Sequence, residues 1–122
     1  MPRSAAPGAI GVHPIGVNGL NWSGHAGFGS RGPAWYTDRS GIVHLEGAVK
    51  AISNGGPFAG LVGTLPRAAR PSRAVYLITH TFAGTYSDLE ITPDGRILRV
   101  GAHVPAVDDN SFLSLESITY KH

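Results

Sequence analysis

Cysteine is absent from the 122-residue chain. This excludes a disulfide scaffold, a thiol nucleophile and a zinc or iron–sulfur site built on thiolates. Charge is also scarce: Asp, Glu, Lys and Arg make up 15% of the residues, against roughly 25% in ordinary domains. Only Lys50 and Lys121 are lysines and no basic run occurs, so the sequence predicts no nucleic-acid surface. Apolar runs fall short of the ~20 residues of a membrane span, and the N-terminus lacks the apolar core of a signal peptide. We therefore expect no membrane partner.

Carboxylates are missing from residues 1–33, and the first one along the chain is Asp38. The same stretch is rich in Gly and Pro and shows neither a helical nor a strand period. The sequence predicts an extended arm over residues 1–33 and a separate body over residues 34–122. The arm is expected to bind another surface through its apolar side chains, which are Ile10, Val12, Ile15, Val17, Leu20, Trp22 and Phe28.

Short strand patterns separated by turns fill the rest of the chain. Residues 42–51 alternate with period two, and the β-branched residues 74–81 are typical of a central strand. Residues 92–95, Thr-Pro-Asp-Gly, form a strong hairpin signal, and the change of apolar phase near Glu116 predicts a bulge. With no run of helical period, the pattern predicts an all-β fold: a single antiparallel, jelly-roll-like β-sandwich of about seven strands. A body of about 90 residues without disulfides is marginally stable alone, which favours self-association.

Catalytic and cofactor motifs are weak. Residues 27–32 match GxGxxG, but Pro33 follows where a phosphate-binding helix should begin. The sequence holds no GxSxG and no HExxH. His44 and Glu46 share a strand face, where symmetry copies could bring metal ligands together, but a polar outward or subunit-facing position is favoured. The carboxylates are interpreted as solvated, and Asp108–Asp109 as turn residues rather than calcium ligands. We expect no enzyme activity, cofactor or metal.

Two groups of residues remain as ligand-binding candidates. Arg67, Arg70 and Arg73 lie in one turn with two prolines, and guanidinium groups bind carboxylate, phosphate or acidic sugar. Plain solvation or contact with a neighbouring subunit remains the alternative. The aromatic side chains could stack on sugar rings, although core or interface positions are more common for such residues; they are Trp22, Trp35, Tyr36 and Tyr86.

The order of these segments resembles a known family. Trp22 in a Gly-rich lead-in precedes WYTDRSGIVHLEGAV (35–49), TLPRAARPSRAV (64–75), ITPDGRILRVG (91–101) and FLSLESITY (112–120). Together they are similar to the β-sandwich knob at the C-terminus of tail-fibre and minor tail proteins of tailed bacteriophages. The resemblance implies a homotrimer with an attachment or structural role. Glu46 stands where the family's pattern has a basic residue.

A knob with a short arm and no shaft suggests a place directly on the virion surface, on the capsid exterior or the tail. The first hypothesis is a capsid decoration protein whose arm docks on the major capsid protein. The alternative is a tail-fibre or tail-tip knob that binds tail proteins and host cell-surface carbohydrate through loops 66–73 and 102–110. A free-standing cellular lectin is a third hypothesis. These rest on analogy with virion architecture and not on a site.

Overall fold

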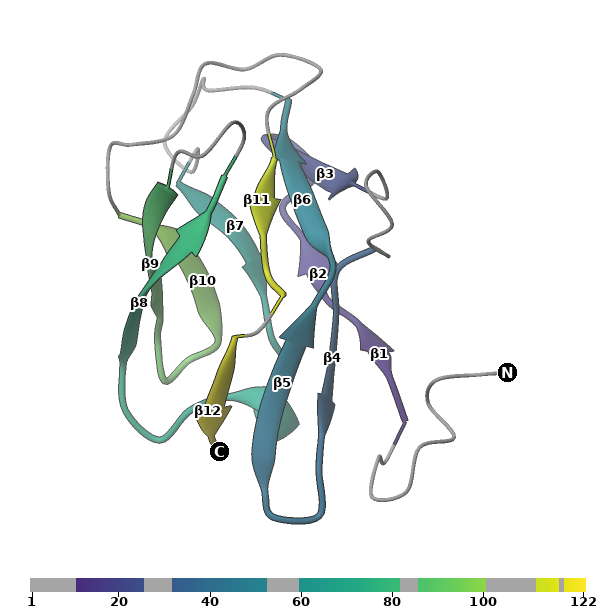
Figure 1. Ribbon diagram of the computed structural model, residues 1–122, viewed down its shortest axis with the longest axis vertical. Coiled ribbons are helices and arrows are strands. Elements are labelled where there is room, and N and C mark those ends of the chain that lie inside the picture. The colour runs from purple at the N-terminus through teal and green to yellow at the C-terminus, as the bar shows by residue number, and fades with distance from the viewer. Residues whose placement is uncertain (1–10, 26–31, 53–59, 82–85, 101–111, 117) are drawn as a thin grey trace.

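Antiparallel β-strands form the body of the protein (Figure 1). The structure is a computed structural model that describes residues 11–25, 32–52, 60–81, 86–100, 112–116 and 118–122. The strands in these ranges are β1 (His13–Pro14), β2 (Gly16–Val17), β3 (Trp22–His25), β4 (Ala34–Thr37), β5 (Ile42–Glu46), β6 (Ala48–Ala51), β7 (Leu61–Thr64), β8 (Val75–His80), β9 (Tyr86–Ile91), β10 (Arg96–Arg99), β11 (Leu113–Ser114) and β12 (Thr119–Lys121). The 3₁₀ turn η2 (Arg67–Ala69) lies between β7 and β8.

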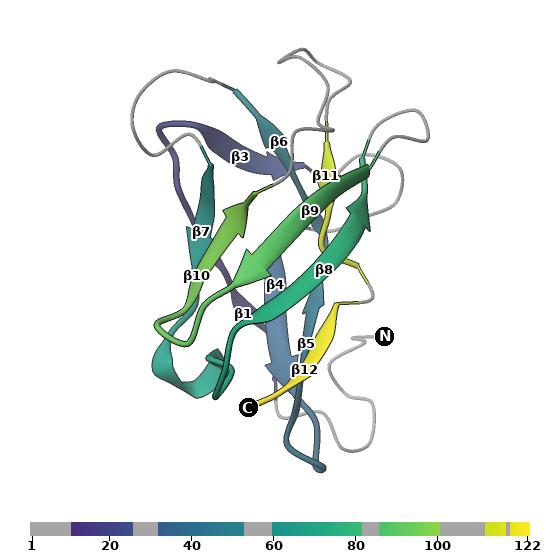
Figure 2. The same cartoon turned by 90° about the vertical axis from the view of Figure 1, so that its left-hand side faces the viewer.

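Three antiparallel sheets hold these strands, in the orders β1-β4-β5-β12, β2-β7-β10-β9-β8 and β11-β6-β3. The all-β prediction is therefore confirmed, while a single sandwich of about seven strands is not what the described residues form. The difference arises because long segments are interrupted: Gly47 separates β5 from β6, and residues 115–118 separate β11 from β12. The irregularity predicted near Glu116 lies at the second interruption. Figure 2 shows β8, β9 and β10 in front of β4 and β5, so the five-stranded sheet packs across the other two.

Hydrogen bonds join the two interruptions. The Gly47 amide donates to Oε2 of Glu116 at 2.6 Å, and the Leu115 amide donates to the Gly47 carbonyl at 2.9 Å. These bonds satisfy backbone groups that the regular ladder leaves unpaired at a break. Two short sheets thus follow one another along the same pair of chain segments, β5–β6 and β12–β11.

The N-terminal segment differs most from its prediction. Residues 13–25 contribute a strand to each of the three sheets: β1 pairs with β4, β2 with β7, and β3 with β6. Asn18 fastens the segment further, since its amide nitrogen Nδ2 donates to the Leu61 carbonyl at 2.9 Å. Residues 13–25 therefore belong to the sheets, and this corrects the prediction of an arm set apart from the body. Two-residue strands in different sheets are too short to show a period in the sequence.

The apolar residues expected to bind a partner through the arm differ from one another in their surroundings. Ile15 and Trp22 belong to this chain's own core, and Val17 packs against it. Val12 is half-buried, whereas Leu20 is 80% exposed. Ile10 and Phe28 lie outside the described residues, as do Asp108, Asp109 and most of the 27–32 glycine motif. Burial of Ile15 and Trp22 makes them supports of the fold and removes them from any free binding surface.

A single apolar core lies between the sheets. Its members come from nearly every strand, and the largest fully buried ones are Trp22, Leu65, Leu89, Ile91, Ile97, Leu113 and Leu115. No helix in the described ranges is long and apolar enough to cross a bilayer.

Candidate functional site

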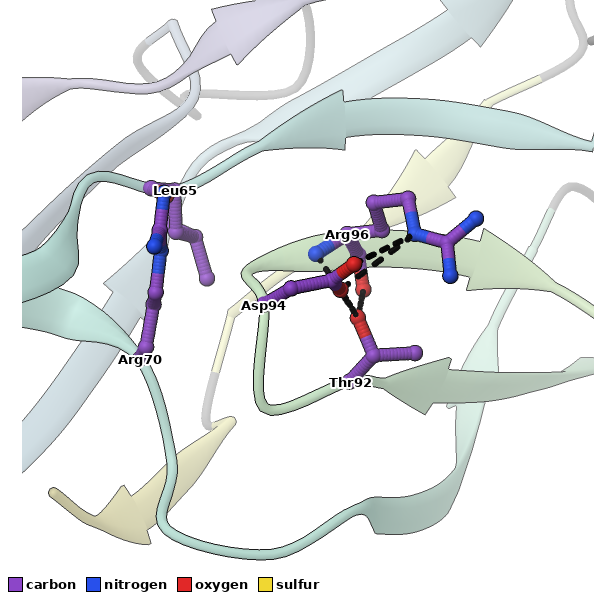
Figure 3. Close-up of polar contacts among 5 residues, drawn as sticks. All are labelled: Leu65, Arg70, Thr92, Asp94 and Arg96. Carbon is purple, nitrogen blue, oxygen red and sulfur yellow. Dashed lines mark hydrogen bonds and ion pairs between the residues drawn. The ribbon is translucent and has the colours of Figure 1, made fainter.

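The turn that carries the three arginines, residues 66–73, is fixed to the body by its middle part. The Tyr120 hydroxyl donates to the Ala69 carbonyl at 2.6 Å, and His122 Nδ1 donates to the Arg70 carbonyl at 2.8 Å. The Nε group of Arg70 donates to the Leu65 carbonyl at 3.2 Å (Figure 3). Arg70 therefore closes the turn on itself, and its guanidinium is partly used for structure.

Arg67 and Arg73 differ from Arg70. Both are exposed, and the structure records no ion pair between either of them and another described residue. Arg67 stands in η2 and Arg73 lies two residues before β8. Of the three arginines proposed for a ligand, these two are open to an anionic group in solution. A guanidinium offers several N–H donors in a plane, which suits carboxylate and phosphate oxygens.

The β9–β10 hairpin turn supports the arginine turn from one side. The Leu65 amide donates to the Gly95 carbonyl at 2.7 Å, so the two turns are in direct contact. Within the hairpin, Thr92 Oγ1 donates to Asp94 Oδ1, and Arg96 Nε lies 3.3 Å from the same carboxylate (Figure 3). The Thr92 bond, followed by the Arg96 contacts, holds the pKa of Asp94 below its ordinary value. This polar network fixes the conformation of the hairpin turn that contacts Leu65.

A second polar cluster lies at the β4–β5 turn. Asp38 accepts backbone bonds from Ser40 at 2.8 Å and from Ile42 at 3.1 Å, and its other oxygen lies 2.8 Å from His44 Nε2. The His44 bond is the main cause that lowers the pKa of Asp38, with the Ile42 amide next. The Tyr36 ring stacks on His44 at 4.7 Å between centroids. This cluster stabilises the turn.

Metal binding at His44 and Glu46 gains no support from their surroundings. His44 Nε2 is occupied by Asp38, and Glu46 is buried at 8% exposure. In the parts of the chain that the structure describes, no three His, Asp or Glu side chains converge as metal ligands do.

The outer face of β8 and β9 is a feature that the sequence did not indicate. Tyr76 and Ile78 of β8 are 71% and 68% exposed, and Val100 beside them is 54% exposed. A shallow groove of about 310 Å³ runs between these three side chains and reaches Asp88 on β9. The prediction of a central strand for residues 74–81 is wrong, because β8 is the last strand of its sheet. Of the aromatic candidates for sugar stacking, Trp22 and Trp35 are buried, Tyr36 is half-buried and Tyr86 is 45% exposed.

The fold and these surfaces define an all-β protein with exposed turns and no converging catalytic groups among the described residues. No protein-family model matches the sequence, and no curated protein matches it either. Among solved structures, the chain is similar to the receptor binding protein (gp15) of Listeria phage PSA. The TM-score is 0.59 at 18% identity, over 90% of this chain and 64% of that chain. The shared feature is the fold, and this chain spans less than two thirds of the phage protein's length.

Proposed function

We propose that this chain is a non-enzymatic host-attachment protein of a bacteriophage tail that binds carbohydrate on the bacterial surface. The observation that carries the proposal is the fold likeness to a phage receptor binding protein over 90% of the chain. The succession along the sequence of segments 35–49, 64–75, 91–101 and 112–120, which resembles that of tail-fibre knobs, supports the same proposal. Fold alone does not determine function, so an attachment protein must also present a surface that suits its receptor.

A capsid decoration role is not proposed. That hypothesis depended on a free N-terminal arm that lies on a shell. Residues 13–25 instead form strands in all three sheets, with Ile15 and Trp22 in the core. The structural likeness is to a host-binding protein of a phage, which favours the alternative reading of the sequence.

The arginine turn is the surface that we assign to the receptor. Arg67 and Arg73 are exposed, while Arg70, Ala69 and Leu65 fix the turn between the C-terminal strand and the β9–β10 hairpin. A turn held in this way presents its charged groups without a large ordering cost on binding. The ligand it suits is an anionic carbohydrate, whose phosphate or carboxylate groups bind guanidinium.

A wall-binding assay tests the function and the surface together. Purified protein is mixed with cell walls from a panel of bacterial species, and the bound fraction is measured with and without released wall carbohydrate. We expect saturable binding to the walls of at least one species, competed by that carbohydrate. The double variant Arg67→Ser/Arg73→Ser should bind at least tenfold more weakly. Arg39→Ser, which removes an exposed arginine from the β4–β5 turn, is the matched control and should bind as the wild type does.

Two outcomes contradict different parts of the proposal. Absence of binding to every wall preparation overturns the attachment function. Wall binding that survives in Arg67→Ser/Arg73→Ser leaves attachment standing and overturns the assignment to the arginine turn.

A further inference from the structure

Strand β8 combines an open sheet edge with the most exposed apolar side chains of β7–β10. It is the last strand in the order β2-β7-β10-β9-β8, so only one of its two edges pairs with another strand of this sheet. Tyr76 and Ile78 project from β8, and Val100 lies next to them across the groove. We call Tyr76, Ile78 and Val100 the β8 surface. Figure 2 shows β8 along the near side of the molecule.

The edge of β8 is open along only part of its length. At its C-terminal end, Thr79 Oγ1 donates to the Ser114 carbonyl at 2.6 Å, and Thr81 forms an isolated bridge with Leu113. Towards the N-terminal end, a second groove of about 310 Å³ separates residues 75–78 from Ile118 and Thr119. Backbone groups in this open part of the edge are available to another molecule.

The devices that usually protect an edge strand are absent from β8. Its sequence, VYLITH, contains no Lys, Asp, Glu or Pro, and its pairing with β9 runs without a register shift from Val75 to His80. Natural proteins blunt free edges with charges, prolines and bulges because a flat apolar edge pairs with other chains. The sequence of β8 therefore favours association.

We infer that a second copy of this chain covers the β8 surface. From their exposed fractions, the three side chains offer roughly 300–400 Å² of apolar area. This is the size of a functional patch and on the order of half of the ~800 Å² that each partner gives to a stable interface. The open backbone of residues 75–78 adds the directional bonds that such an apolar centre lacks.

The chemistry of the surface favours protein over carbohydrate as its occupant. Ile78 and Val100 have no hydrogen-bonding groups in their side chains, whereas sugar sites need polar groups that converge on hydroxyls. The carboxylates of this face, Asp88 and Glu90, stand on β9 directly opposite Ile78 and Tyr76, and Asp88 lines the groove between Ile78 and Val100. A contact centred on the open edge of β8 therefore has to leave these like charges solvated on its β9 side. The inference is independent of what the arginine turn binds.

The oligomeric state of matched variants tests the inference. The molar mass of the purified full chain is measured by light scattering after gel filtration over a range of concentrations. We expect a multiple of the 12.7 kDa chain mass, and three times that mass if the trimer implied by the sequence resemblance is correct. Ile78→Lys should give the monomer mass, because burying the ammonium in the contact costs more in desolvation than its pairing with Asp88 across the strand returns. Leu20→Lys makes the same kind of change in the turn between β2 and β3, at a side chain that is 80% exposed. This variant should keep the wild-type mass.

A thiol-reactivity measurement guards against a variant that merely fails to fold. The chain has no cysteine, so Ile78→Cys and Leu20→Cys each carry a unique thiol. In the assembled protein the thiol in Ile78→Cys should react with a thiol reagent at least tenfold more slowly than the one in Leu20→Cys. A monomeric wild type overturns the inference, and so does an unchanged mass for folded Ile78→Lys. Equal reactivity of the two thiols in the oligomer shows that copies meet elsewhere and overturns it as well.

Discussion

Substitution of Gly95 by Ala should break the contact between the β9–β10 hairpin and the arginine turn and destabilise the fold. Gly95 has a φ of +91°, a region that L-residues adopt at a cost of about 1–2 kcal/mol. An added Cβ would also overlap the Leu65 carbonyl oxygen and lie 2.8 Å from Arg70 Nε. Both neighbours must then move, which breaks the Leu65–Gly95 backbone bond and the Arg70–Leu65 bond.

The size of the effect follows from these parts. Each of the two lost hydrogen bonds contributes about 0.5–1.5 kcal/mol, so with the backbone cost Gly95→Ala should destabilise the fold by about 2–5 kcal/mol. Gly41→Ala is the matched control, since Gly41 has a φ of +82° but no atom within 4 Å of the added Cβ. It should lose only the backbone part, about 1–2 kcal/mol. Urea titration followed by circular dichroism gives both free energies of unfolding. Equal losses in the two variants would refute the argument that the Leu65–Arg70 contact adds to the conformational cost.

Three further substitutions test other parts of the structure. Trp22→Ala should cost about 3–5 kcal/mol in urea titration, because this ring is 2% exposed in the core; a loss below about 1 kcal/mol would favour a separate arm after all. Tyr120→Phe should cost about 1–3 kcal/mol, since it leaves the fully buried Ala69 carbonyl without its donor, and an unchanged unfolding midpoint would count against that bond. The pKa of Asp38 is lowered in the folded state mainly by His44, so its contribution to stability is present above the ordinary value of 3.8 and is lost as the pH falls below it. Asp38→Asn should therefore lose less stability than the wild type on acidification through this range, and parallel curves of unfolding midpoint against pH would contradict the pairing.

Local signals in the sequence predicted the turns well. Thr92, Pro93 and Gly95 identify the β9–β10 hairpin because each has a distinct backbone role, and the structure confirms the turn by the bond from the Thr92 amide to the Arg96 carbonyl at 3.0 Å. The period of residues 42–51 likewise places Val43, Leu45 and Val49 in the core, although Glu46 and Ala48 of the opposite face are buried as well. Such features depend on neighbours in sequence, and composition and order suffice to find them.

Long-range placement could not be obtained in the same way. The β-branched run of β8 is typical of a central strand, yet only the pairing of the whole sheet decides which strand stands last. The segment around Ile15 gives no period because it passes from one sheet to another after two residues. Arg67, Arg70 and Arg73 are alike in sequence, and only the Leu65 carbonyl distinguishes the structural one. These properties arise from contacts between segments far apart in the chain.

The proposed assembly at β8 and the proposed attachment through the arginine turn make a joint prediction. Arg73 lies two residues before β8, so each copy in an assembly formed at β8 would carry its own arginine turn next to the N-terminal end of that strand. Several such turns on one particle would bind a repetitive wall polymer with an avidity that can exceed the affinity of one turn by about 10²–10⁴. A monomeric Ile78→Lys should therefore keep the weak affinity of a single turn for a short wall fragment and lose most of its binding to intact walls. Loss of both would mean that the β8 surface itself contacts the receptor, and loss of neither would separate attachment from assembly.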